Sequence, residues 1–204
     1  MQTKPFSFFP TVFLCCAGAI LLAACSTTQA PVARYDFGVT SSVTAKLACT
    51  LPPINLAEIT TTSALDSDLM LYRLNYANDQ QTQAYAAHRW SMPPAQLLSQ
   101  RIKAQLADQG VTLLDPGMLL PNAVQLRLEL NDFGQYFTDS AHSTAQVKVR
   151  ASLLRGHALI AQTNLLQQTP TNAPDAPAGA QAMRVASDAL ISDLTVWLCK
   201  QTQP

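Results

Sequence analysis

The stretch Val124-Gln125-Leu126-Arg127-Leu128-Glu129-Leu130 decides the fold, because its apolar and polar residues alternate without an error. Alternation with a period of two places one set of side chains in a core and the other in water, which indicates a strand in a sheet with one solvated face. A second run alternates in the same way over residues 145–153, and a third strand is expected over residues 159–167, after a turn at Arg155-Gly156-His157. Consecutive strands with short connections predict an antiparallel meander.

Shorter strands are expected upstream of this meander. Three segments have strand character: residues 34–38, 54–60 and 70–76. After a turn at Asn78-Asp79, residues 82–90 should return as the second arm of a hairpin.

Two long helices are expected beside the sheet. The first should begin near Ser91, an N-cap candidate followed by prolines, and end at Gly110. The last should follow a proline-rich loop over residues 170–179 and run from Ala180 to Cys199 with an apolar stripe. The sequence therefore predicts one domain of the α/β class, α+β in character, with a mixed and largely antiparallel sheet packed against two long helices.

The segment Leu22-Ala23-Ala24-Cys25 has the pattern of a lipid-attachment site at the end of a short apolar run. The residues before it have the three parts of a bacterial export signal: a positive start at Lys4, an apolar segment over residues 12–22, and small residues before the cut. An uncleaved transmembrane helix is the alternative, but this run is well short of the ~20 apolar residues that a span needs. We therefore expect a signal peptide over residues 1–24 and a lipid anchor on Cys25.

A tether, and a residue that influences membrane sorting, are expected directly after the cleavage site. Residues 25–33 are small and polar and are expected to be a flexible tether, and residues 34–200 are expected to form the folded domain. Residue 26 is Ser and not Asp. In enterobacterial lipoproteins an Asp at this place retains the protein at the inner membrane, so the periplasmic face of the outer membrane is favoured over the inner membrane.

Cys49 and Cys199 are the two cysteines that remain once the signal peptide and Cys25 are set aside. An even pair in an oxidising compartment is expected to form a disulfide, which would join the start of the domain to its last helix. Two buried free thiols are the alternative, because the sequence does not give the distance between the two Cα atoms.

Charge and motifs argue against several classes of function. Removing residues 1–24 leaves 12 basic against 13 acidic residues, so the domain lacks the basic excess that nucleic-acid binding requires. No hydrolase, zinc-protease or phosphate-loop motif is present. The residues that could serve as acids or bases are far apart or in turns: His88, His142, His157, Asp66 and Asp68. We therefore expect no enzyme, no cofactor and no metal, with a periplasmic hydrolase as the less favoured alternative.

Tyr85, Arg89 and Trp90 form an aromatic and cationic cluster with two interpretations. An Arg over an aromatic ring at a surface could anchor a partner protein. Alternatively, Trp90 lies in the core where the strand meets the helix, and Arg89 is exposed or bonded to a loop.

Several blocks along the chain resemble one known family. They are Tyr35-Asp36-Phe37-Gly38, Leu65-Asp66-Ser67 with Met70-Leu71-Tyr72-Arg73, and Tyr85-Ala86-Ala87-His88-Arg89-Trp90 with Pro93-Pro94. Together with the lipid-attachment pattern, their order and spacing resemble the ABC-type transport auxiliary lipoprotein family, which includes the PqiC-like lipoproteins. The resemblance runs from about Arg34 to the last helix.

The resemblance implies a non-enzymatic role in intermembrane lipid transport. Its expected partners are an MCE-domain protein and an ABC permease and ATPase, with the lipoprotein docking the conduit at the outer membrane and the membrane held through its lipid. Direct binding of phospholipid, as a periplasmic lipid carrier, is an alternative, and a homo-oligomer is left open. Cys25 is the only position in this sequence to which the resemblance assigns a function.

Overall fold

The computed structural model describes residues 2, 31–39, 47, 49–115, 117–118, 120 and 122–202. Cys25, the rest of the expected signal peptide apart from Gln2, and most of the loop expected over residues 39–50 lie outside these residues. Val32–Pro204 is one compact unit, and it holds every strand and helix of the described part of the chain.

The expected meander is present and consists of three long antiparallel strands. They are β6 (Val124–Phe137), β7 (Ser143–Arg155) and β8 (Ala158–Pro170). Leu128 lies opposite Ala151, and Ala151 lies opposite Thr163, so the alternating apolar residues of β6 and β7 share one face of the sheet. β7 and β8 extend beyond their predicted bounds at both ends, whereas β6 begins at the predicted Val124 and continues to Phe137.

A bulge explains why β6 is longer than its sequence pattern indicates. The register with β7 shifts between Leu130 and Asp132. Even-numbered residues are buried up to Leu130, whereas Phe133 and Phe137 are buried beyond it. The extra residue of a bulge moves the inward face by one position, so the strand continues while its alternation changes phase.

The other edge of β6 is paired with short parallel strands. β2 (Ile54–Leu56), β3 (Thr60–Thr61) and β4 (Leu69–Leu74) follow one another along it. β4 forms the expected hairpin with β5 (Thr82–Trp90), and β1 (Ala33–Tyr35) adds to β5 in parallel. The sheet is therefore mixed, in the order β1-β5-β4-β6-β7-β8, with β2 and β3 on β6.

The two long helices are present, with starts that differ from the sequence prediction. α2 (Pro94–Asp108) has Pro93 and not Ser91 at its N-cap, and Gly110 follows its end with a φ of +80°. α3 (Ala176–Thr202) begins four residues before the predicted Ala180. The carboxylate of Asp175 accepts a hydrogen bond from the Ala178 amide at 2.9 Å, so the acidic residue of the proline-rich loop caps the helix.

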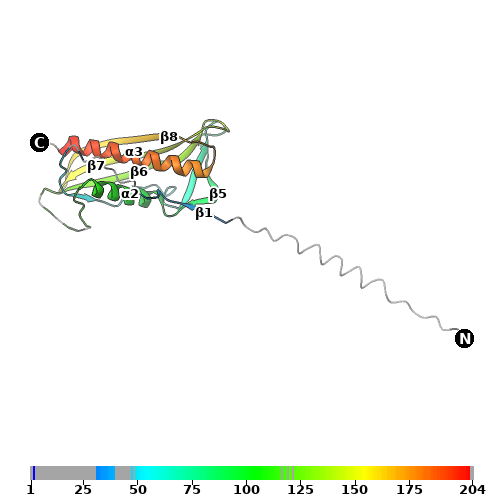
Figure 1. Cartoon of the computed structure of the whole chain (residues 1–204), viewed down its shortest axis with the longest axis horizontal. Coiled ribbons are helices and arrows are strands. Elements are labelled where there is room, and N and C mark those ends of the chain that lie inside the picture. The colour runs from blue at the N-terminus through cyan, green and yellow to red at the C-terminus, as the bar shows by residue number, and fades with distance from the viewer. Residues whose placement is uncertain are drawn as a thin grey trace. The chain divides into compact units, whose positions relative to one another are not determined.

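Both helices pack on the same face of the sheet (Figure 1). Their stripes include Leu98, Ile102, Leu190 and Leu194, all fully buried in one core with the inward residues of β6 and β7. The opposite face of the meander is polar and holds side-chain pairs across strands, such as Gln162 with Ser152. This arrangement confirms the single α/β domain with one solvated sheet face.

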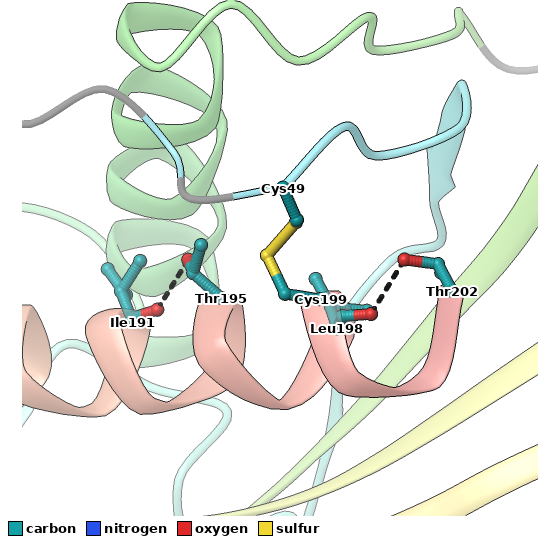
Figure 2. Close-up of a disulfide and its surroundings, with 6 residues drawn as sticks. All are labelled: Cys49, Ile191, Thr195, Leu198, Cys199 and Thr202. Carbon is teal, nitrogen blue, oxygen red and sulfur yellow. Dashed lines mark hydrogen bonds between the residues drawn. A yellow bond between two sulfur atoms is a disulfide. The ribbon is translucent and has the colours of Figure 1, made fainter. Parts of the chain in front are cut away.

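A disulfide closes the domain between Cys49 and Cys199 (Figure 2). Their Cα atoms are 5.8 Å apart, although the cysteines are separated by 150 positions in the sequence. Around it, Thr195 and Thr202 donate hydrogen bonds to the carbonyl oxygens of Ile191 and Leu198 in α3. The bridge fixes the segment that leads into β2 against the last turns of this helix.

We expect Cys49→Ala to lower the free energy of unfolding of the full-length protein by roughly 4–5 kcal/mol, because a long closed loop loses its constraint in the unfolded chain. Chemical denaturation followed by circular dichroism measures this change. Cys199→Ala and the Cys49→Ala/Cys199→Ala double variant should show the same loss. A much larger loss in the double variant than in either single variant would contradict a shared bond.

Candidate functional site

Trp90 of the expected partner-contact cluster lies in the core. Its side chain is 3% exposed, and its ring stands edge-on to Phe133 with 5.3 Å between ring centroids. The Phe37 ring packs against both, with its centroid 6.2 Å from that of Trp90 and 6.3 Å from that of Phe133. The structure therefore matches the second interpretation of this cluster for Trp90, which is held at the junction of β5 and α2.

Arg89 and Tyr85 are half-buried, and both form hydrogen bonds within the domain. The Arg89 guanidinium donates hydrogen bonds to the backbone carbonyls of Tyr85 and His88. The Tyr85 hydroxyl donates to Oε1 of Gln135 at 3.0 Å. A partner contact by these two side chains remains a prediction, and it would use the surface of β5 beside the buried Trp90.

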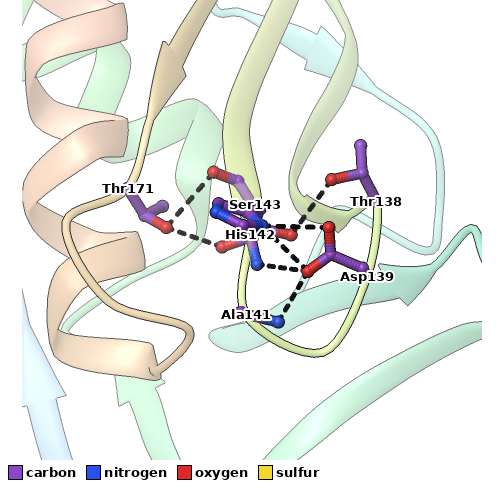
Figure 3. A network of polar contacts seen from close by, with 6 residues as sticks. All are labelled: Thr138, Asp139, Ala141, His142, Ser143 and Thr171. Carbon is purple, nitrogen blue, oxygen red and sulfur yellow. Dashed lines mark hydrogen bonds and ion pairs between the residues drawn. The ribbon is translucent and has the colours of Figure 1, made fainter.

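A polar network ties the start of α3 to the sheet under this surface. Gln135 is 4% exposed, and its Nε2 donates to Oγ of Ser143 at 2.8 Å and to the Asp175 carbonyl at 3.4 Å. Oγ of Ser143 is in turn 2.6 Å from Oγ1 of Thr171, across the loop that leads into α3 (Figure 3). Gln135, Ser143 and Thr171 thus each have a hydrogen-bond partner within this network, which fixes its geometry.

Gly179 makes room for this network. A Cβ added to Gly179 would collide with Oε1 of Gln135, the atom that accepts the hydrogen bond from Tyr85. The helix therefore lies directly on the amide, and only glycine permits this approach.

Two tyrosines, Tyr85 and Tyr136, have pKa values raised above the ordinary tyrosine value. Burial is the main cause that raises the pKa of Tyr85, and the nearby Tyr72 and Asp175 raise it further. Burial also raises the pKa of Tyr136, with a contribution from its hydrogen bond to Asp132. Both side chains are hydrogen-bond donors in the neutral form, not proton-transfer groups poised near neutral pH.

The histidines and carboxylates that the hydrolase alternative requires are not brought together. His142 lies in the β6–β7 turn with its Nδ1 2.9 Å from Asp139, whose pKa is lowered mainly by hydrogen bonds from the Ala141 amide and the His142 side chain (Figure 3). His88 is bonded to the Tyr35 hydroxyl at 3.0 Å.

The remaining candidates also lie apart. His157 is exposed in the β7–β8 turn, Asp68 pairs with Arg34 at 2.9 Å, and Asp66 is exposed. Within the described residues, no group of three or more His, Cys, Asp or Glu side chains could hold a metal ion. The arrangement of these five candidates therefore provides no catalytic constellation.

An ion pair between the helices was missed by the sequence analysis. Arg101 of α2 is 6% exposed and binds the Asp188 carboxylate of α3 with two hydrogen bonds of 2.7 and 2.8 Å. Gln105 donates to the same carboxylate at 2.6 Å. The hydrogen bonds to Asp188 raise the pKa of Arg101. Nothing in the sequence pairs Arg101 with a residue 87 positions away.

The hollows of the domain are small or open. The hollow between α3 and the sheet, beside Met70 and Met183, holds about 10 Å³. A larger one of about 110 Å³ lies along β6 between β3 and β4, where Asn131 to Gly134 have no partner strand on that edge. Small-molecule sites typically hold about 300–1,000 Å³, so neither is large enough for an acyl chain. No helix in the described part of the chain is long and apolar enough to cross a membrane.

The family model described as "ABC-type transport auxiliary lipoprotein component" matches residues 35–194. The chain belongs to this family. The match begins at Tyr35, the last residue of β1, and runs through most of α3, so it includes β2 to β8 and the polar network. The family is one of transport auxiliary lipoproteins and not an enzyme family, so the chain has a transport-auxiliary role.

Solved structures share the fold of this family member. Protein XCC0632 from Xanthomonas campestris is 16% identical, with a TM-score of 0.67 over 84% of this chain and 94% of that one. A second structure, described as an uncharacterized protein, is 12% identical, with a TM-score of 0.64 over 82% of this chain and 99% of that one. At these identities the likeness concerns the fold alone. No curated protein sequence matches the chain.

We expect Gly179→Ala to destabilise the full-length protein by about 1–3 kcal/mol, because overpacking displaces the amide beneath the helix. Chemical denaturation measures the loss. The cost should be smaller when Gly179→Ala is introduced into a Gln135→Ala background, where the colliding side chain is shorter. Equal costs in both backgrounds would show that the two residues do not interact.

Stability should fall as the pH rises above about 10, because Tyr85 and Tyr136 have raised pKa values in the fold. Their contribution is complete below the pKa of an unfolded tyrosine and is lost as the pH rises toward the folded pKa. Denaturation midpoints and tyrosinate absorbance as functions of pH measure this. Tyr85→Phe should reduce the slope above pH 10, whereas Tyr76→Phe, at an exposed site, should leave it unchanged.

Proposed function

We propose that this protein is a lipid-anchored periplasmic subunit of an MCE-type lipid transport system, which docks the transport conduit at the outer membrane. In this proposal Cys25 carries the lipid after removal of residues 1–24, and residues 25–33 are the tether. An MCE-domain protein, with its ABC permease and ATPase, is the partner. The protein contributes a binding surface held at a membrane and performs no reaction.

The observation that carries the proposal is family membership over residues 35–194, together with the lipid-attachment pattern at Leu22–Cys25. Auxiliary components of an ABC transporter act through contact with the other subunits. The pattern at Leu22–Cys25 supports a position at a membrane, and Ser26 supports the outer membrane.

The position of β1 supports a short distance between domain and membrane. β1 begins at Ala33, only eight residues after Cys25. A fully extended chain spans at most about 3.3–3.6 Å per residue, so the lipid would lie within roughly 30 Å of the strand. A domain on so short a tether must receive its partner at the membrane and cannot carry cargo across the periplasm.

The small hollow between α3 and the sheet weighs against the lipid-carrier alternative. That space is occupied by the side chains of Met70, Trp90, Phe133 and Met183, and only about 10 Å³ is left. A carrier needs a cavity that takes an acyl chain, so the geometry favours a docking role.

We expect Cys25→Ala to move the protein from the membrane fraction to the soluble periplasm and to abolish transport, because the docking surface is no longer held at the membrane. The variant should still co-purify with the MCE-domain protein from cells that express the whole system. Fractionation, lipid-transport measurement and co-purification test these three results.

Ser26→Asp is the matched control, because it keeps the lipid and changes only the sorting residue. It should remain membrane-bound, move to the inner membrane and lose transport. The proposal fails if wild-type protein does not co-purify with the MCE-domain protein, or if Cys25→Ala supports full transport.

A further inference from the structure

The loop that precedes β6 presents apolar side chains to solvent. Among its described residues, Met118 is 46% exposed and Leu120 is 43% exposed. Single apolar residues scattered over a surface are ordinary, whereas a group of them commonly marks a contact surface. These two residues belong to one short loop, and its backbone holds them in place.

Both ends of this loop are fixed to the start of β2. The Leu114 amide donates a hydrogen bond to the carbonyl oxygen of Ile54 at 2.9 Å, and the Val124 amide donates one to that of Pro53 at 3.0 Å. Leu114 and Val124 are themselves buried. The loop therefore leaves the core and returns to it at neighbouring residues.

Two turns of the same kind shape the loop. The first is Asp115-Pro116-Gly117-Met118, whose last amide donates to its first carbonyl oxygen at 3.0 Å, and the second is Leu120-Pro121-Asn122-Ala123, with the same bond at 3.2 Å. The third residue of each turn has a positive φ, +88° at Gly117 and +64° at Asn122. Proline at the second place and a positive φ at the third are the features of a type II turn. A loop fixed in this way loses little conformational freedom when a partner binds it.

The start of β8 lies at the same end of the sheet as this loop. Leu154 of β7 lies opposite Gln125 of β6 on one side and opposite Leu159 of β8 on the other. Leu159 is also largely exposed. The loop and the start of β8 thus bring exposed apolar side chains to one end of the domain, which we call the distal end and define by Met118, Leu120 and Leu159.

The tether enters the domain toward the opposite end. β1 is parallel to β5, β5 is antiparallel to β4, and β4 pairs in parallel with the last three residues of β6. β1 therefore runs against β6, and its first residue, Ala33, is on the side of Phe137 and not of Val124. In Figure 1, β1 and β5 lie at one end of the domain and the C-terminal end of α3 lies at the other.

We propose that the distal end is the surface on which the protein partner of this lipoprotein docks, by burying Met118, Leu120 and Leu159 against an apolar surface of its own. This inference rests on the proposed function, in which that partner is the MCE-domain protein. The lipid on Cys25 would hold the membrane at the end where β1 begins. The distal end would then face the periplasm, where it meets a protein and not a bilayer.

Charged substitutions in the loop test the location of the contact. Met118→Glu and Leu120→Glu should each lower the amount of MCE-domain protein that co-purifies with the full-length lipoprotein at least about fivefold, because each buries a carboxylate in an apolar contact. Val185→Glu is the matched control: Val185 is also 46% exposed, but it lies in the middle of α3. It should leave co-purification unchanged, and all three variants should keep the wild-type denaturation midpoint.

Photo-cross-linking tests the same contact without a change of charge. The photoreactive residue p-benzoylphenylalanine, placed at position 118 or 159, should cross-link to the MCE-domain protein in cells that express the whole transport system. The same residue at position 185 should not. Because the cross-link reports a neighbour directly, a loss of stability in a loop variant does not affect this result.

Three outcomes would overturn the proposal. They are unchanged co-purification in the Met118→Glu/Leu120→Glu double variant, an equal loss in Val185→Glu, and cross-links from position 118 to phospholipid or to a second copy of this chain and not to the partner. In each of these cases a wild-type protein that still co-purifies leaves the docking role intact, and only its location is wrong. If the wild type does not co-purify, the docking role and the location fail together.

Discussion

The pairing of β6 on both of its edges is the constraint on which the rest of the domain depends. One edge holds β7 over nearly the whole strand, and the other holds β2, β3 and β4 in succession. The inward residues of β6 form the floor on which α2 and α3 pack, and several are fully buried. A tight turn cannot connect two parallel strands. The strands β2, β3 and β4 precede β6 in the chain and are therefore connected to it through longer segments. The disulfide at Cys49 and the Arg101–Asp188 pair hold those loops and helices against it.

The sequence predicts what depends on local alternation and misses what depends on register. β5 begins and ends where its pattern indicates, and the meander, both helices and the mixed sheet were all predicted. β6 was cut short at Leu130, because the bulge moves the inward face from even to odd positions and the pattern becomes ambiguous there. The start of α3 was placed too late for a different reason: proline and polar residues indicate a loop, whereas Asp175 caps a helix whose first turn accepts Pro177.

The candidate site could be predicted only in part, since its contacts join distant segments. Trp90 was a residue with two interpretations, and its position against Phe37 and Phe133 requires three strands and loops to meet. The network from Tyr85 through Gln135 to Ser143 has no sequence signal, because a glutamine within a strand looks like any other polar residue. One indication was available in retrospect: Gly179 interrupts a helix that otherwise contains no glycine, and a glycine there marks a close approach.

The two edges of the sheet differ in length and composition, and this difference bears on the docking role that we propose. β1 is short, lies next to the tether and closes its edge after three residues. β8 is long, uncharged and open, and it lies five strands away. At about 4.8 Å between neighbouring strands, the open edge is roughly 24 Å from the tethered one. In a protein that binds small molecules, buried polar groups typically line a cavity. Here the buried polar network holds the start of α3 on the sheet. In the proposed docking role a partner would therefore meet the surface of the domain, and of the two terminal strands in the strand order β8 is the longer and lies at the edge farthest from β1.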